Sequence, residues 1–268
     1  MFSAQLWQNI LGATLFFLLL GAVVGVLLAI ADRLFAVKQD ERIPKIIDCL
    51  PGANCGGCGY SGCAACAQAI VNGQAKVNAC PVGGEAAANA IAAVMGVSAE
   101  KAARRRAQIL CCGTSDAAKL KYRYVGAQDC VAANRIGGGA KACPNGCIGL
   151  GSCSVICPFH AIEIKNGIAA VNAEKCQGCG LCADVCPKHI IRLIPWEAKY
   201  VVGCSSTEKG TLTRSVCTAG CIGFRLCEKK CPVQAIRADG FLAKIDYDAC
   251  TGCGACANAC PRGIIRAL

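Results

Sequence analysis

Cysteines at fixed spacing are the residues of this chain most able to do chemistry, and there are 26 of them among 268 residues. Two segments, "CQGCGLCADVCP" at 176–187 and "CTGCGACANACP" at 250–261, share the pattern C-x2-C-x2-C-x3-C-P. Three thiolates on a tight loop, with a fourth before a proline, form a ligand pattern of [4Fe–4S] clusters. Because the fourth cysteine of such a run binds a neighbouring cluster, we expect each run to have a partner run.

The expected partner runs are "CPNGCIGLGSCSVICP" at 143–158 and "CTAGCIGFRLCEKKCP" at 217–232, which read C-x3-C-x5-C-x3-C-P. Leu150 and Phe224 occupy the usual position of the middle cysteine, so Cys143 or Cys217 is the natural substitute ligand. The crossing rule of two-cluster ferredoxins then predicts four clusters. Their ligand sets are Cys143, Cys147, Cys153 and Cys186; Cys176, Cys179, Cys182 and Cys157; Cys217, Cys221, Cys227 and Cys260; and Cys250, Cys253, Cys256 and Cys231.

These runs belong to an internal duplication, because nine cysteines recur at one displacement of 74 positions, the first pair being Cys130 and Cys204. So many matches at one displacement indicate a repeated structural unit. Each copy also contains a hairpin pattern, "AIEIKNGIAAVN" and "AIRADGFLAKID", in which Asn166-Gly167 and Asp239-Gly240 are the predicted turns. Each copy is therefore predicted to be a small α+β ferredoxin domain.

A further cysteine group opens with "LPGANCGGCGYSGC" at 50–63, which places Cys55, Cys58 and Cys63 at C-x2-C-x4-C, with Cys80 following. The intervening glycines permit positive φ and a close approach of the backbone to a bound group. After Cys63 the residues predict a short helix that ends at Asn72-Gly73. The spacing indicates a metal site.

Ahead of all these cysteines, residues 10–31 carry no charge, and a helix of that length spans about 30 Å, one bilayer core. The stretch is too long for a secretory signal and has no basic segment before it. Basic residues follow it, beginning with Arg33, so we expect the N-terminus outside an inner membrane and the rest of a single-pass protein in the cytoplasm.

Disulfides and zinc are the alternative uses of so many thiols. A cytoplasmic location disfavours a disulfide framework, and zinc sites usually show two separated C-x2-C pairs. The formal net charge of +11 counts every cysteine as neutral, whereas about five clusters of charge about −2 would nearly cancel it. Because no basic stripe interleaved with aromatic residues is present, we expect no nucleic-acid partner.

Six cysteines lie outside the predicted ligand sets: Cys49, Cys66, Cys111, Cys112, Cys130 and Cys204. The simplest interpretation is that they are buried and inert. The repeat displacement pairs Cys130 with Cys204, and a second interpretation is that these two support or replace a ligand. The local wording instead pairs Cys112 with Cys204, and the sequence leaves both pairings open. Residues 99–108, "AEKAARRRAQ", predict a basic helix capped by Ser98, and His160 and His189 are expected on the surface.

A membrane helix, the segment "LPGANCGGCGYSGC" and a duplicated two-cluster unit together resemble the RnfB family over essentially the whole chain. "VVGCSSTEKG" before the second copy resembles it too. Members of this family are iron–sulfur subunits of the Rnf ion-translocating oxidoreductase complex, a membrane-bound ferredoxin:NAD oxidoreductase that moves Na⁺ or H⁺. The resemblance implies that Cys55, Cys58, Cys63 and Cys80 hold a fifth [4Fe–4S] cluster.

The resemblance also implies that the chain accepts electrons from soluble ferredoxin and passes them to membrane and flavin-bearing subunits, ending at NAD. No catalytic residue is expected on the chain itself, because no P-loop or dinucleotide-binding glycine motif is present. Two other functions stay open: a subunit that reduces a redox-sensing transcription regulator, and a metal-stapled structural protein without redox activity.

The predicted fold class is one N-terminal transmembrane helix followed by small α+β iron–sulfur domains, with two tandem bacterial-type two-cluster ferredoxin domains at the end. The expected boundaries are a transmembrane anchor at 1–33, a four-cysteine [4Fe–4S] domain at 34–97, a helical or strand connector at 98–124, and ferredoxin domains at 125–197 and 198–268.

Overall fold

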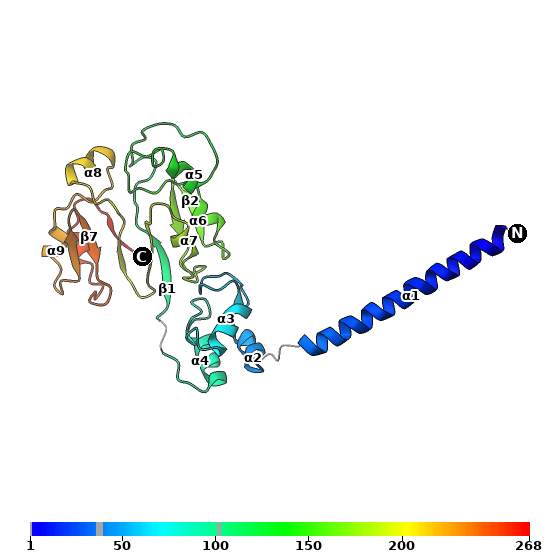
Figure 1. The fold of residues 1–268 in the computed structure, drawn as a ribbon. Helices are drawn as coiled ribbons and strands as arrows, with labels where there is room; N and C mark the ends of the chain where they lie inside the picture. Colours follow the sequence, from blue (N-terminus) through cyan, green and yellow to red (C-terminus); the bar gives the residue numbers. More distant parts are fainter. Residues whose placement is uncertain (1, 36–39, 101–102) are drawn as a thin grey trace. The chain divides into compact units, whose positions relative to one another are not determined.

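The main element described in the N-terminal unit of the chain is one long helix. The computed structural model describes residues 2–35, 40–100 and 103–268, and the chain divides into a first unit, Met1–Glu41, and a second, Arg42–Leu268. The first unit contains helix α1 (Phe2–Phe35), drawn in blue in Figure 1. Its stretch Ile10–Arg33 has a mean hydropathy of 2.7 and is not buried within the chain. This apolar stretch is long enough to cross a bilayer, which agrees with the predicted anchor.

The second unit begins with a small group of helices around an apolar core. These helices are α2 (Arg42–Cys49), α3 (Cys63–Val71) and α4 (Gly84–Met95). Ile46 from α2, Ile70 from α3 and Ile91 from α4 are fully buried together, so one isoleucine of each helix forms the centre of the core. Helix α3 ends at Asn72 and Gly73, as the sequence predicts, and Gly73 has a φ of 73°.

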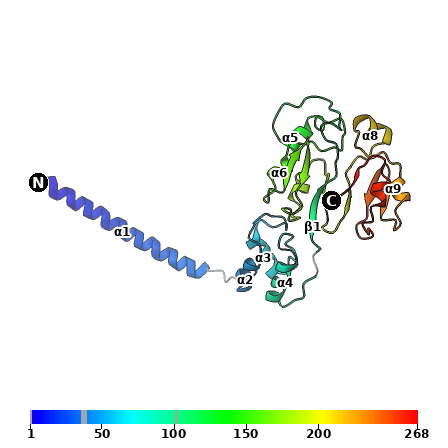
Figure 2. The ribbon, with the colours of Figure 1, turned by 180° about the vertical axis from the view of Figure 1, so that it is seen from behind.

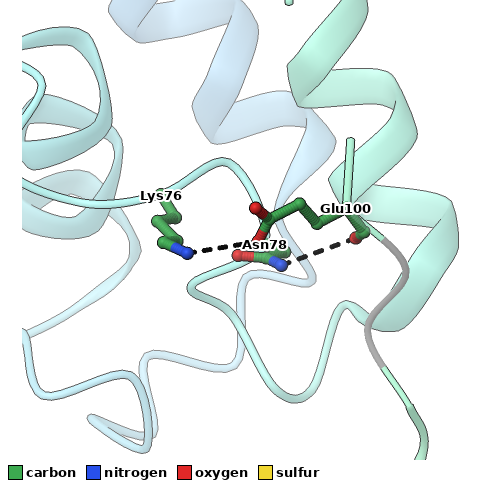
Figure 3. A network of polar contacts seen from close by, with 3 residues as sticks. All are labelled: Lys76, Asn78 and Glu100. Atoms are coloured by element: carbon green, nitrogen blue, oxygen red, sulfur yellow. Dashed lines mark hydrogen bonds and ion pairs between the residues drawn. The ribbon is translucent and has the colours of Figure 1, made fainter. Parts of the chain in front are cut away.

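A polar network fastens the segment after α4 to the loop after α3 (Figure 3). The ammonium of Lys76 lies 3.1 Å from a carboxylate oxygen of Glu100, and the side-chain amide of Asn78 donates to the Glu100 carbonyl oxygen. The two charged side chains are 75% and 72% exposed. An exposed ion pair is worth at most about 1 kcal/mol, so this network positions the segment more than it stabilises it.

The first ferredoxin unit contains two antiparallel strand pairs and three short helices. In chain order they are β1 (Arg105–Ile109), α5 (Cys130–Arg135), α6 (Ser152–Val155), β2 (Ile162–Lys165), β3 (Ile168–Val171), α7 (Leu181–Asp184) and β4 (Ile191–Pro195). Strands β2 and β3 form the predicted hairpin, and its turn residues Asn166 and Gly167 have φ values of 48° and 73°. Strand β1 pairs with β4, so the unit's first strand joins its last.

The sequence-based prediction of a basic helix at 99–108 is wrong where the structure describes those residues. Arg105–Ile109 form β1, in which Ala107 and Ile109 alternate inward, while residues 101–102 lie outside the described residues. Pairing with β4 outweighs the local helix propensity of this arginine-rich stretch. The guanidinium of Arg104 lies 3.5 Å from the ring centre of Trp196, so the basic side chains line the edge of a sheet.

The second ferredoxin unit repeats the same pairings and is drawn in yellow to red in Figure 2. Its elements are β5 (Tyr200–Val202), α8 (Gly210–Val216), α9 (Leu226–Lys229), β6 (Ile236–Asp239), β7 (Leu242–Ile245), α10 (Ala255–Asn258) and β8 (Ile265–Ala267). Strand β5 pairs with β8, and β6 pairs with β7.

The second hairpin turn lies one residue later than predicted. The β6–β7 register pairs Asp239 with Leu242, so the central turn residues are Gly240 and Phe241, not Asp239 and Gly240. Gly240 has a φ of 61° and supplies the positive φ that Asn166 supplies in the first copy. The register of the strands, and not the local Asp-Gly pair, decides the turn.

Cysteines make up much of the interior of both ferredoxin units. In the first unit the buried cluster combines cysteines with a few aliphatic side chains, of which Ile190 is 1% exposed. The backbone carbonyl of Ile190 also accepts a hydrogen bond from Leu110 N–H. With so little apolar volume, each aliphatic side chain carries a large share of the burial.

Replacing Ile190 with alanine is expected to cost about 2–5 kcal/mol of unfolding free energy, because it leaves a cavity in a small core. Ile164→Ala on β2 is the control, since Ile164 is 37% exposed. We expect Ile190→Ala to unfold at lower denaturant and to release iron to a chelator faster, with little change for Ile164→Ala. Equal behaviour of the two variants would contradict this assignment of the core.

Candidate metal centres

Five cavities in the ferredoxin units are each lined by three or more cysteines. Their empty volumes are about 310–370 Å³. Among the residues that the structure describes, no three cysteine, histidine or acidic side chains lie close enough to hold a single metal ion. The cysteine sets are therefore defined by the cavities that they line.

Two of these cavities unite predicted ligand sets completely. One is lined by Cys157, Cys176, Cys179 and Cys182, and the other by Cys231, Cys250, Cys253 and Cys256. In the first, the amide of Ala107 donates to Cys176 Sγ at 3.3 Å and the amide of Ala161 donates to Cys157 Sγ at 3.4 Å. Amide donors of this kind favour the thiolate form and tune iron–sulfur clusters.

Glycines in these two cysteine runs allow the backbone to pack closely against the first strand of each ferredoxin unit. Gly178 has a φ of 65° and Gly254 a φ of 79°. A Cβ on Gly178 would clash with the carbonyl oxygen of Arg105, and one on Gly254 with the hydroxyl of Tyr200. At Gly178 both conformation and space therefore require glycine, and at Gly254 the positive φ favours it.

A third cavity contains three predicted ligands and one unpredicted cysteine. It is lined by Cys130, Cys147, Cys153 and Cys186, together with apolar residues of β1 and β4. Cys130 is the first residue of α5, whose Asp129 carboxylate caps the helix by accepting from Ala132 N–H. Cys143, the predicted fourth ligand, lines a different cavity. The structure thus brings Cys130 to the position that was expected for Cys143.

The matching cavity of the second copy has only three cysteines, Cys221, Cys227 and Cys260. Cys217, its predicted fourth ligand, lines the same separate cavity as Cys143. Phe224, which occupies the position of the missing middle cysteine, lines this cavity together with Arg225. The chain is much shorter here: Cys204 precedes Cys217 by 13 positions, whereas Cys111 precedes Cys143 by 32. The shorter segment contains α8 but no cysteine between Cys204 and Cys217, so the second copy has no counterpart of Cys130.

The structure also resolves which cysteines correspond between the copies. Cys111 follows β1 and Cys204 follows β5, and each sulfur accepts from the amide two residues later. Each also accepts from the amide of a cysteine that the repeat relates, Cys147 or Cys221. The counterpart of Cys204 is therefore Cys111. Both pairings left open by the sequence, with Cys130 and with Cys112, are wrong.

The N-terminal cysteine set lies beside the three-helix core. Cys58, Cys63 and Cys80 pack against that core, and the pKa of Cys80 is raised first by burial and then by the charges of Cys58 and Cys55. The side-chain amide oxygen of Asn54 accepts from Cys63 N–H at 2.8 Å, which holds the glycine-rich loop over α3.

Cys66 lies among these thiols without belonging to the predicted set. Burial, and after it the charge of Cys58, raises the pKa of Cys66 to about 12. Cys66 is thus a buried neutral thiol, as the simplest interpretation of the spare cysteines predicts.

The N-terminal set directly adjoins one ferredoxin cavity. A Cβ on Gly57 would lie 2.8 Å from both Cβ and the carbonyl oxygen of Cys179, so only a glycine fits at this contact. Burial raises the pKa of Cys179, and the charge of Cys55 adds to this rise. Cysteines from two different predicted clusters therefore face each other across the Gly57 contact.

Burial keeps many of these thiols protonated. Desolvation raises the pKa of Cys153 to about 12 and that of Cys182 to about 12. A ligand thiol must lose its proton, so a metal group that binds here displaces protons and supplies the missing positive charge.

The cysteine sets fit iron–sulfur clusters both in the chemistry of their donor atoms and in the closeness of the surrounding backbone. Converging thiols, amide donors to sulfur and glycines at close backbone approaches are the features that such clusters need. His160 and His189 are exposed, as predicted, and neither lines a cysteine cavity described above. The donor side chains gathered at these cavities are therefore thiols.

Two family models match the chain where these cysteines lie. One described as "Putative Fe-S cluster" matches residues 50–82, and one described as "4Fe-4S binding domain" matches residues 169–192 and 243–266. The chain thus contains 4Fe–4S binding domains, which agrees with the α+β iron–sulfur fold class that the sequence predicts.

Several relatives match the chain over nearly its whole length, and each is the B-type subunit of its complex. The chain is 43% identical over 246 residues to that of the Na⁺-translocating ferredoxin:NAD⁺ oxidoreductase complex of Acetobacterium woodii, covering 91% of this chain and 74% of the relative. It is 43% identical to that of the ion-translocating oxidoreductase complex of Methanosarcina acetivorans, covering 92% and 94%. It is 38% identical to that of the proton-translocating ferredoxin:NAD⁺ oxidoreductase complex of Clostridium ljungdahlii, covering 93% and 89%.

Cys130→Ala is expected to lower the iron content, because it removes one of the four thiols of its cavity. The loss should be about one to four iron atoms per chain, depending on whether a smaller cluster survives. Cys49→Ala is the control, because the half-buried Cys49 packs against the helical core and lines none of the five cavities. Iron and acid-labile sulfide are measured on anaerobically purified protein. Full iron content in a folded Cys130→Ala variant would return the ligand role to Cys143.

Proposed function

Because this chain belongs to the RnfB family, the B-type subunits of ion-translocating oxidoreductase complexes, we propose that it is the electron-relay subunit of a membrane-bound ferredoxin:NAD oxidoreductase that translocates Na⁺ or H⁺. It takes electrons from reduced soluble ferredoxin and passes them toward the other membrane and flavin-bearing subunits. The observation that carries the proposal is the series of cysteine-lined cavities on one chain.

We propose five clusters for this relay. Four sets have four thiols each: Cys55, Cys58, Cys63 and Cys80; Cys130, Cys147, Cys153 and Cys186; Cys157, Cys176, Cys179 and Cys182; and Cys231, Cys250, Cys253 and Cys256. The fifth site has the three thiols of Cys221, Cys227 and Cys260. When bound, such clusters supply one-electron redox steps, and the chain's residues set their potentials through burial and hydrogen bonds.

The chain's own residues place neighbouring sites in series. Within the first ferredoxin unit, Cys153 and Cys157 lie on one short run but line two different cavities. Cys182 and Cys186 do the same in the opposite direction, so two covalent connections join the two sites. The contact of Gly57 with Cys179 then links the N-terminal set to this pair. These connections support a route from the N-terminal domain into the first ferredoxin unit.

The second ferredoxin unit presents a face suited to an acidic electron carrier. Phe224 is 62% exposed beside the three-cysteine cavity, and Arg225, Lys229 and Lys230 are exposed next to it. Basic side chains steer an acidic protein into contact, and exposed apolar ones give it a surface to bury. We propose that soluble ferredoxin docks here.

The membrane part of the proposal rests on α1. Its apolar stretch anchors the chain, with the N-terminus outside and the iron–sulfur domains on the cytoplasmic side. Electrons then arrive at the inner face of the membrane, where the other subunits receive them.

Reduction by ferredoxin tests the proposed function directly. The full chain, purified anaerobically in detergent, is mixed with chemically reduced ferredoxin, and bleaching of cluster absorbance is followed. We expect bleaching by ferredoxin and no direct reduction of NAD⁺ by this chain alone. Direct NAD⁺ reduction, or no bleaching by ferredoxin with clusters intact, would reject the proposal.

Gly57→Val is expected to slow electron exchange between the N-terminal cluster and its neighbour, because the new side chain forces the backbone away from Cys179. Iron content should stay unchanged, and rapid-freeze EPR after ferredoxin mixing should show delayed reduction of one cluster. Ala64→Val, on the exposed side of α3, is the control. The same delay in both variants, or in neither, would argue against a route through this contact.

A further inference from the structure

Besides Cys112, four cysteines that none of the five proposed clusters uses line one cavity between the two ferredoxin units. They are Cys111 and Cys143 from the first ferredoxin unit and Cys204 and Cys217 from the second ferredoxin unit. The cavity has an empty volume of about 340 Å³. We propose that these four residues bind a further [4Fe–4S] cluster, with two ligands from each unit.

The two halves of this site are equivalent. Cys111 Sγ accepts from Gly113 N–H at 3.3 Å and from Cys147 N–H at 3.4 Å. In the second unit Cys204 Sγ accepts from Ser206 N–H at 3.4 Å and from Cys221 N–H at 3.3 Å. Paired amide donors stabilise a thiolate and are a feature of iron–sulfur ligands. The same ligand arrangement thus occurs twice, facing one cavity.

The two halves meet at the sulfur atoms. A Cβ on Gly113 would lie 3.5 Å from Cys111 Sγ and 3.5 Å from Cys217 Sγ, so sulfurs of both units approach one point. Burial raises the pKa of Cys143 and of Cys217, and the charge of Cys111 adds to both rises. These three thiols therefore lie close to one another.

Backbone contacts hold the two units together beside this cavity. Ala118 and Cys217 form an antiparallel bridge, and Thr218 N–H donates to Ala117 O at 2.8 Å. Lys119 N–H donates to Val216 O at 2.9 Å on the other side of the bridge. These bonds fix the position of Cys217 relative to the first unit, which a ligand set shared by both units needs.

A buried cation points to an anionic occupant. Lys141 is 7% exposed and lines the cavity, and its ammonium donates to the carbonyl oxygens of Gly113 and Gly167 at 2.7 Å each. A buried ammonium held only by neutral acceptors is costly. A four-iron core with four thiolates carries a charge of about −2, which would compensate it.

The remaining cysteine at the cavity is a poor fifth candidate. Cys112 follows Cys111, but its sulfur packs tightly against Gly203, where a Cβ would clash with it. Desolvation raises its pKa. Cys112 therefore provides a matched control for its neighbour.

The position of the site assigns it a role that rests on the proposed function. Cys111 Sγ accepts a hydrogen bond from the backbone amide of Cys147, which lines one neighbouring cavity. Cys204 Sγ accepts one from the backbone amide of Cys221, which lines another. A cluster held here would accept one electron from the neighbouring cluster of one ferredoxin unit, which is thereby oxidised, and would pass that electron to the neighbouring cluster of the other unit, which is thereby reduced. The site would therefore connect the clusters of the two ferredoxin units into one electron-transfer chain.

Iron counting on single and double variants tests the proposal. We expect Cys111→Ala and Cys204→Ala each to lose about one to four iron atoms per chain, with matching sulfide. The double variant should lose no more than about four, because both residues serve one cluster. Cys112→Ala should keep its iron. Full iron in a folded Cys111→Ala variant, losses that add beyond one cluster in the double variant, or a single zinc atom in place of iron would each overturn the proposal.

The intact full chain provides a second test that needs no substitution. Thiol alkylation followed by mass spectrometry should leave Cys111 and Cys204 unmodified until a chelator removes iron, and their labelling should then rise with iron release. Labelling of either residue while all iron is retained would overturn the proposal. These readouts are independent of electron transfer from ferredoxin, so failure of the site and failure of the proposed function are distinguishable.

Discussion

The ferredoxin units of this protein depend on thiols that must be kept out of water and yet be deprotonated. In the first unit the buried interior contains Cys147, Cys153, Cys157, Cys176 and Cys182 beside only a few aliphatic residues. Burial alone holds such thiols in the neutral form, because it raises the pKa of Cys153 and of Cys182. A cationic core makes their ionisation favourable, so cluster binding is expected to stabilise the folded form of these units.

Close backbone approach follows from the same requirement. Amides donate to cysteine sulfurs in both ferredoxin units. In the first, Gly178 with its positive φ contacts Arg105 of β1, the strand from which Ala107 donates to Cys176. Where a glycine contacts another segment, as Gly57 contacts Cys179, the contact also sets the spacing of neighbouring sites. One residue type thus serves both ligand geometry and the distance over which electrons move.

Local patterns made most of the fold and part of the site predictable from sequence. The C-x2-C-x2-C-x3-C-P runs and the Asn166-Gly167 hairpin depend only on nearby residues. The structure gathers the first three cysteines of each run in one cavity and pairs β2 with β3 across the predicted turn. Cys130 and Cys111 depend on a chain segment whose length differs between the copies, so a single displacement of 74 misaligned them. Strand β1 depends on β4, which lies more than 80 positions further along the chain. The propensities of neighbouring residues do not predict a strand whose partner is so distant in sequence.

In each ferredoxin unit the opening strand pairs with the closing strand, β1 with β4 and β5 with β8. The chain consequently enters and leaves each unit at adjacent points. A module closed in this way can be spliced in tandem with another copy without rerouting the backbone around it. An electron-transfer chain can therefore be extended by the duplication of one ferredoxin unit, because each unit contains its own cysteine-lined cavities.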